Sequence, residues 1–133
     1  MRVVLDVNVL VSALLSPTGA PALLIEKWLF GEFELVVSSR LLEEVNRALA
    51  YPKVNRRLQS DARVQLVALL EEFGEYAADP PRHSVRSPDP GDDYLVALAA
   101  SERATLVSGD SHLLALRGSI PVLSPREFLD SLA

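Results

Sequence analysis

The stretch Met1-Arg2-Val3-Val4-Leu5-Asp6 predicts the first element of the fold. From Arg2 to Asp6 it is a short, β-branched, apolar run that ends in an acid, which is typical of a buried strand. Val9 to Leu15 continues as an apolar segment of helical character, and Pro17-Thr18-Gly19 interrupts it. A buried strand followed directly by a helix is the opening of an α/β fold.

The rest of the chain repeats this alternation of strands and helices. Further strands are predicted at 35–37, 105–108 and 120–123, and helices at 22–30, 38–50, 61–73, 92–103 and 111–116. Ser124, Pro125 and Glu127 form a capping-box signature that begins a C-terminal helix. Pro121 places the last strand at a sheet edge or at a bulge. The order predicts an α/β fold with a central, mostly parallel sheet.

Composition narrows the class of protein. The 133 residues, 49% of them hydrophobic, fit a single domain over 1–133 with a packed core. The chain has no cysteine, which excludes a disulfide framework and a thiolate zinc site. No apolar run approaches the roughly 20 residues of a membrane span. We therefore expect a soluble, cytoplasmic protein that does not enter a membrane.

Charge is distributed unevenly along the chain. The formal net charge of −5 argues against nucleic-acid binding over the whole surface. Residues 40–63 contain six basic and three acidic residues, so this segment carries +3 and the remainder −8. The segment predicts either a local basic surface or a solvated helical hairpin.

Two acids follow predicted strands. Asp6 ends the first strand, and Asp110 comes two residues after the strand at 105–108. In open α/β sheets, ligands bind beyond the carboxyl ends of the strands. Both acids are therefore expected at that edge of the sheet.

Two more acids begin helices at the same edge. On a helical wheel Glu44 lies at the border of an apolar face, whereas Glu43 points away from it. Asp92 shares the apolar stripe of its helix, and Asp93 lies about 100° away, which suggests an exposed or supporting residue. The choice between the members of each pair, with Asp89 as a further candidate, stays open.

Each of these acids also has a purely structural interpretation. Asp6 and Asp110 are suitable caps for the elements that follow them, and Glu44 and Asp92 are suitable first-turn acids. Their predicted convergence favours a site, because clustered carboxylates repel one another unless a cation joins them. Mg²⁺ and Mn²⁺ prefer such hard oxygen ligands, and one or two ions activate water and stabilise charge on a phosphodiester.

Four stretches carry a resemblance to a known family. They are 4–12 (VLDVNVLVS), 38–45 (SSRLLEEV), 89–95 (DPGDDYL) and 106–110 (LVSGD), with a further match at 120–129. In this order and spacing the sequence resembles PIN-domain proteins, and most closely the VapC-like toxin components of bacterial toxin–antitoxin systems. Val7 and Ser108 depart from the family pattern, which often has threonine at both positions.

The resemblance implies a PIN-like three-layer α/β/α sandwich and a Mg²⁺- or Mn²⁺-dependent endoribonuclease. It places Asp6, Glu44, Asp92 and Asp110 at the metal and catalytic positions. It also gives Asn8 and Ser108 supporting roles. An RNA substrate, a cognate antitoxin and a homodimer or higher homo-oligomer are expected partners. Candidate RNA-contacting residues are Arg40, Arg47, Lys53, Arg56 and Arg57.

Two alternative functions stay open. One is another Mg²⁺-dependent phosphohydrolase with Asp6 as a nucleophile, although Asn8 stands where such enzymes commonly have an acid. The other is a PIN-fold protein that acts mainly by protein binding, with the helix around Trp28 as a partner surface. Trp28 is more simply interpreted as a core residue. His83 and His112 show no metal-ligand spacing, and both are expected on the surface or in loops.

Overall fold

The computed structural model describes residues 1–81 and 85–133, so His83 and part of the loop predicted at 79–91 lie outside the described residues. The strands are β1 (Arg2–Leu5), β2 (Glu34–Val37), β3 (Glu75–Tyr76), β4 (Thr105–Val107) and β5 (Val122–Leu123). The helices are α1 (Val7–Leu15), α2 (Ala20–Leu29), α3 (Ser39–Ala50), α4 (Pro52–Asn55), α5 (Ala62–Phe73), α6 (Asp93–Ser101), α7 (Ser111–Leu114) and α8 (Pro125–Ser131), with a 3₁₀ turn at Pro90–Asp92.

The five strands form one sheet in the order β3-β2-β1-β4-β5, and all four strand pairs are parallel. The α/β fold with a mostly parallel sheet is therefore confirmed. β5 lies at an edge, as the proline before it predicted. The chain builds outward from β1 to β2 and β3, then returns to the other side of β1 to add β4 and β5. The order thus reverses between β1 and β4, where open α/β sheets bind ligands.

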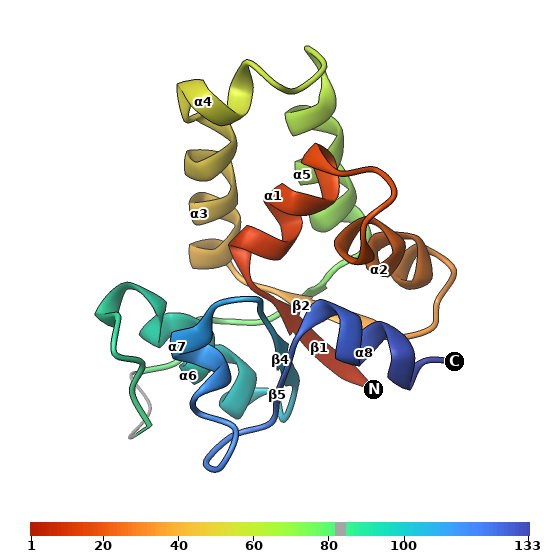
Figure 1. The fold of residues 1–133 in the computed structure, drawn as a ribbon. Helices are drawn as coiled ribbons and strands as arrows, with labels where there is room; N and C mark the ends of the chain where they lie inside the picture. Colours follow the sequence, from red (N-terminus) through yellow and green to blue (C-terminus); the bar gives the residue numbers. More distant parts are fainter. Residues whose placement is uncertain (82–84) are drawn as a thin grey trace.

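Helices cover both faces of the sheet (Figure 1). Helices α1, α2, α3 and α5 pack together on one face, and α6 packs on β1 and β4 from the other face. This is the three-layer α/β/α arrangement that the sequence predicted. Right-handed crossover connections between parallel strands explain this placement of the helices. The chain moves one way across the sheet from β1 to β3 and the other way from β3 to β5, so the two sets of connecting helices lie on opposite faces.

The core lies between the sheet and these two helical layers. β1, β2 and β4 are almost wholly buried, which explains their continuous apolar runs. Trp28 is 5% exposed and belongs to this core, as the simpler interpretation of the sequence had it. Within the described parts of the chain, no single helix is long and apolar enough to cross a bilayer; α1 and α2 pass only as a pair bent by 100°.

Three local features differ from the sequence prediction. The edge strand β3 was missed, since two residues are too few for a periodic signal. Pro52 ends α3 as expected, but it also occupies the first turn of the short helix α4. The helix predicted from Asp92 begins at Asp93, after a 3₁₀ turn. The capping box at Ser124 and Glu127 is present as predicted.

Candidate active site

Asp6 and Asp110 lie at the reversal point of the sheet. β1 and β4 are neighbours, with Leu5 in register with Val107. The backbone N–H of Asp6 donates to the Val107 carbonyl at 2.9 Å, which extends the pairing by one residue. The two carboxylates therefore follow adjacent strands at one edge, as the sequence predicted.

Ser108 links these two acids through a chain of hydrogen bonds. The backbone N–H of Asp110 donates to Ser108 Oγ at 3.0 Å, and the Ser108 hydroxyl donates to Asp6 Oδ2 at 2.7 Å. Ser108 is fully buried and Asp6 is 3% exposed. The Asn8 N–H donates to the other Asp6 oxygen at 3.4 Å. The Asp6 carboxylate is thus held in one orientation.

Burial raises the pKa of Asp6 above its ordinary value, and the hydrogen bonds from Ser108 and Asn8 oppose this effect. The charge of Asp110 raises the Asp6 pKa further. Desolvation is the main cause, since a buried carboxylate loses the water that stabilises its charge. Asp6 is therefore a carboxylate whose charge is only partly compensated by the protein.

Asp92 belongs to the same group of acids. Its pKa is raised to about 6, mainly by burial and also by the charges of Asp6, Asp89 and Asp110, while His112 opposes the rise. The mutual repulsion requires the side chains to lie close enough to interact through a medium of low dielectric. Of the four predicted ligands, Asp6, Asp92 and Asp110 therefore influence one another electrostatically.

Glu44 is held differently. Its side chain is 24% exposed and pairs with Arg47 at 3.0 Å and with Arg40 at 3.6 Å. Glu43 is exposed, so the helical wheel placed the two residues correctly. Glu44 lines the same pocket as Asp92, but its carboxylate is neutralised by arginines rather than grouped with the other acids.

Asp93 is buried, so the expectation that it is exposed was wrong, while the alternative of a supporting residue stays a prediction. It is 5% exposed and accepts a hydrogen bond from the Ser87 N–H at 2.8 Å. The reason is that α6 is buried on nearly every side, so it has no free polar face at this position. Asp89 instead accepts from the Gly91 N–H at 3.0 Å and caps the 3₁₀ turn. Both acids shape the loop that carries Asp92.

Tyr94 was not singled out from the sequence. It is partly buried, and the Arg40 guanidinium lies 4.8 Å from its ring centroid in a cation–π contact. Burial raises the pKa of Tyr94, and the charges of Glu44, Asp6 and Asp92 add to this. Its place two residues after Asp92 was visible in the sequence, but its contact with Arg40 of another helix was not.

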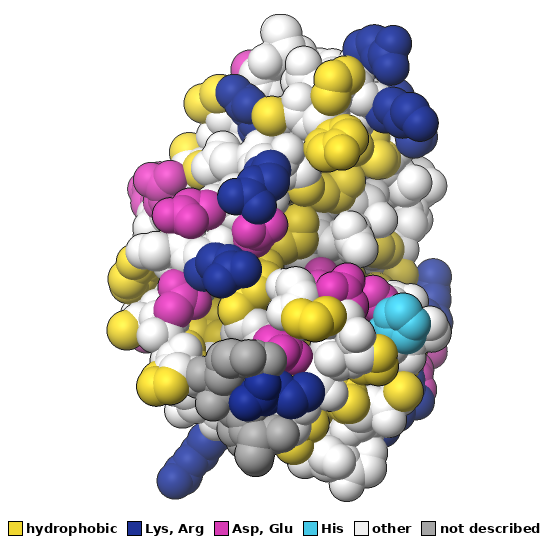
Figure 2. Space-filling model, turned by 90° about the vertical axis from the view of Figure 1, so that its left-hand side faces the viewer, with side chains coloured by type: hydrophobic (Ala, Val, Ile, Leu, Met, Phe, Trp, Pro, Cys, Tyr) yellow, Lys and Arg dark blue, Asp and Glu magenta, His cyan; other side chains and the backbone are white. Residues whose placement is uncertain are grey.

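Two hollows that share Asn8 are lined by acids of the candidate site. One, of about 280 Å³, is lined by Val7, Asn8, Glu44, Arg47, Ala48, Tyr51, Asp92 and Tyr94. The other, of about 300 Å³, is lined by Asn8, Val9, Ser12, Pro21, Gly109, Asp110 and Pro125. Asn8 is exposed and lines both, so it lies between the two acidic walls. Figure 2 shows acidic side chains gathered beside a histidine on this face, with basic side chains nearby.

The donor set suits a hard cation. Over residues 1–81 and 85–133, no three acidic or histidine side chains are arranged to ligate one ion together. Mg²⁺ is commonly held by one or two carboxylates and keeps several waters, so a complete protein cage is not needed. The raised pKa values of Asp6 and Asp92 indicate charge that a cation would compensate. The acids at this edge therefore fit a divalent metal ion.

The predicted basic residues fall into two groups. Arg40 and Arg47 lie on α3 and pair with Glu44, at the acids. Lys53, Arg56 and Arg57 lie in or just after α4, and all three are exposed. None of these three pairs with an acid among the residues that the structure describes. Basic side chains without an ion pair among the described residues thus follow Arg40 and Arg47 along the chain, in and just after α4.

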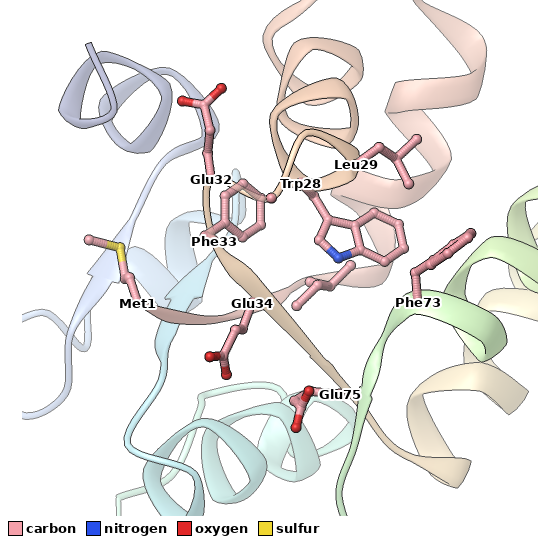
Figure 3. A pocket seen from close by; sticks show the side chains of 10 residues that line it. Met1, Trp28, Leu29, Glu32, Phe33, Glu34, Phe73 and Glu75 are labelled. Carbon is pink, nitrogen blue, oxygen red and sulfur yellow. The ribbon is translucent and has the colours of Figure 1, made fainter.

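A separate pocket of about 450 Å³ lies at the opposite edge of the sheet (Figure 3). Its lining includes Met1, Phe73 and Glu75, at the amino ends of the strands. It contains none of the four predicted ligands. His112 is the second residue of α7 and is exposed, consistent with a surface residue.

Comparisons with known proteins agree with this geometry. An uncharacterised protein of Methanocaldococcus jannaschii, MJ1680, is 23% identical over 140 residues, covering 98% of this chain and 90% of that protein. The crystal structure of VapBC2 from Rickettsia felis, bound to a DNA fragment from their promoter, contains a chain of similar fold. The TM-score is 0.62 at 14% identity, covering 93% of this chain and 98% of that chain. The sequence profile of the PIN domain matches residues 2–112, and the chain therefore belongs to the PIN-domain family.

Proposed function

We propose that this protein is a divalent-metal-dependent endoribonuclease. The observation that carries the proposal is the grouping of Asp6, Asp92 and Asp110 at the reversal point of the sheet, where burial and mutual repulsion raise the pKa values of Asp6 and Asp92. Carboxylates kept close at such a free-energy cost are typical of functional sites. Membership of the PIN-domain family supports the nuclease chemistry.

The acids and Ser108 would have different roles in the site. Asp6, Asp92 and Asp110 would hold Mg²⁺ or Mn²⁺, and Glu44 would join them by exchanging its arginine partners. A bound ion supplies water activation and stabilisation of negative charge during phosphodiester hydrolysis. Ser108 fixes the Asp6 carboxylate through its 2.7 Å hydrogen bond.

The basic residues and Asn8 would handle the substrate. Asn8 lies between the two hollows, where a polar side chain can orient a phosphate or water. Arg40 and Arg47 lie close enough to contact RNA phosphates when Glu44 releases them. Lys53, Arg56 and Arg57 extend this basic surface away from the acids.

A toxin role is part of the proposal. A similar solved structure is a VapBC2 complex, so we propose that this chain is the toxin partner of an antitoxin and forms a homodimer. Protein contacts would then regulate the nuclease rather than replace it.

The test is RNA cleavage by the purified protein with Mn²⁺, with Mg²⁺ and with chelator. Asp6→Asn removes a site carboxylate with little change of shape, and Glu71→Gln removes an exposed acid on α5 as a matched control. We expect metal-dependent cleavage that is lost in Asp6→Asn and kept in Glu71→Gln. A folded protein that neither cleaves RNA nor binds Mn²⁺ by calorimetry would overturn the proposal.

A further inference from the structure

Tyr51 presents an aromatic ring at the rim of the candidate active site. It is 64% exposed and lines the hollow of about 280 Å³ that also contains Glu44 and Asp92. The other aromatic residue in that lining, Tyr94, is partly buried and covered by Arg40. Tyr51 is therefore the aromatic side chain of this hollow with a face open to a ligand.

The backbone of Tyr51 is firmly held. It joins α3 to α4, and its N–H donates to the Ala48 carbonyl at 3.3 Å. Its own carbonyl accepts from the N–H groups of Val54 and Asn55 at 2.9 and 2.8 Å. Pro52 further restricts the residue before it to the extended conformation that Tyr51 adopts. Because the backbone of Tyr51 is already ordered, a ligand that binds to its ring costs little backbone conformational entropy.

The charges around Tyr51 favour a nucleic-acid strand. Arg47 lies in the same hollow, and Lys53, Arg56 and Arg57 follow within six residues. These last three are exposed and form no ion pair among the described residues, and Arg56 Nε donates to the Pro52 carbonyl at 3.1 Å. Aromatic rings beside a basic track are how proteins bind single strands, since bases stack on the ring and cations contact the phosphates. Stacking requires an unpaired base, which selects single-stranded over double-stranded RNA.

We propose that Tyr51 stacks on an unpaired nucleobase next to the phosphate that lies at Asp92, and thereby selects single-stranded RNA. The inference rests on the proposed nuclease function and deepens it. The volume of the hollow is near the lower end of ligand pockets, roughly 300–1,000 Å³, and suits one base rather than a duplex. Lys53 of α4, with Arg56 and Arg57 just after it, would then hold the strand beyond that base.

The experiment measures binding apart from cleavage. Asp6→Asn protein, which is expected not to cleave, is titrated with Mn²⁺ present into a fluorescently labelled RNA oligonucleotide, and anisotropy gives the Kd. Tyr51→Ala and Tyr51→Phe are compared in this background. Phe73→Ala is the matched control, because Phe73 is 57% exposed but lies at the opposite edge of the sheet (Figure 3). Thermal unfolding checks that each variant folds.

We expect Tyr51→Ala to weaken binding roughly 5- to 150-fold, the range for loss of one base-stacking contact. Tyr51→Phe and Phe73→Ala should bind like the parent. With an oligonucleotide of abasic sites, the parent should bind more weakly and Tyr51→Ala should cause no further loss. In the cleaving background, Tyr51→Ala should reduce the preference for single-stranded over double-stranded RNA.

Three results would overturn the stacking role. They are an unchanged Kd in Tyr51→Ala, an equal loss on abasic RNA, or a change in molar mass by light scattering, which would make Tyr51 a protein contact. These outcomes are separate from failure of the proposed function. Loss of the stacking effect with intact RNA cleavage by the wild type would remove only this inference, whereas a wild type that does not cleave RNA would remove the function.

Discussion

Asp92 offers a direct test of whether the acids are held together against their own repulsion. Its pKa is raised from 3.8 to about 6, mainly by burial and then by the charges of Asp6, Asp89 and Asp110. The folded protein therefore binds this proton more tightly than the unfolded chain does. Linkage then requires stability to fall as the pH rises through the window from 3.8 to about 6.

The size of the effect follows from this difference. A pKa change of this size corresponds to about 3 kcal/mol against the charged form. Asp92 is only partly buried, so screening by solvent reduces the effect to about 1–2 kcal/mol. The macrodipole of α6 favours a negative charge here by about 0.3–1 kcal/mol. We therefore expect Asp92→Asn to stabilise the metal-free protein by about 1 kcal/mol at pH 7.5.

Asp92→Asn changes the charge without breaking a capping hydrogen bond, because the Asp92 side chain makes none at the start of α6. Urea unfolding in the presence of chelator at pH 7.5 and pH 4 measures the difference. The gain should be present at pH 7.5 and shrink at pH 4, where wild-type Asp92 is largely protonated. Glu71→Gln, which removes an exposed charge elsewhere, should show no such pH dependence.

Divalent metal should reverse the order of stability of the wild type and Asp92→Asn. An ion that binds only the folded state stabilises it by about 2.7 kcal/mol at 100 times its Kd. With saturating Mn²⁺, the wild type should therefore become more stable than Asp92→Asn. The reasoning would be refuted if Asp92→Asn were less stable than the wild type at pH 7.5 in chelator, or if their difference did not depend on pH.

Three further predictions concern the Ser108 hydrogen bond, the packing of Gly74 and the basic residues Arg56 and Arg57. Ser108→Ala should cost about 1.5–3 kcal/mol in urea unfolding at pH 7.5, since it removes a buried hydrogen bond to a carboxylate, and Ser108→Thr should restore most of it; equal losses in both would contradict this role. Gly74 caps the end of α5, and Gly74→Ala should cost about 1–3 kcal/mol by the same assay, because the new Cβ would clash with the Leu70 carbonyl oxygen and lie 2.8 Å from Val37 Cγ2; an unchanged midpoint would disprove the close approach. Arg56→Ala and Arg57→Ala should each lower the slope of log Kd for RNA against log salt by about 0.7 without changing thermal stability, and an unchanged slope would exclude a phosphate contact.

The structural and functional interpretations of the acids turn out to be compatible. Asp6 accepts a hydrogen bond from Asn8 at the start of α1, and Asp110 accepts one from His112 at 2.8 Å at the start of α7. Each acid therefore caps a helix with one oxygen. Asp110 keeps a partly exposed side chain that lines the hollow. Capping explains how the carboxylates are oriented, and it does not compete with a metal site.

Apart from the short elements β3 and α4, the sequence by itself determined the order of the elements, the parallel character of the sheet and the two acids that follow β1 and β4. These follow from interactions over a few residues: continuous apolar runs, caps such as Ser124 with Glu127, and prolines that end helices. The border position of Glu44 was predictable for the same reason, because a helical wheel needs only local geometry.

Tertiary structure alone decided which neighbours each side chain meets. Asp93 is buried because α6 is enclosed between the sheet and the preceding loop, and no local pattern records that enclosure. Glu44 is held by two arginines, and Tyr51 and Asp92 line the same hollow although 41 positions separate them in the sequence. Burial, charge repulsion and stacking surfaces depend on contacts between distant segments, and those exist only once the sheet has brought the segments together.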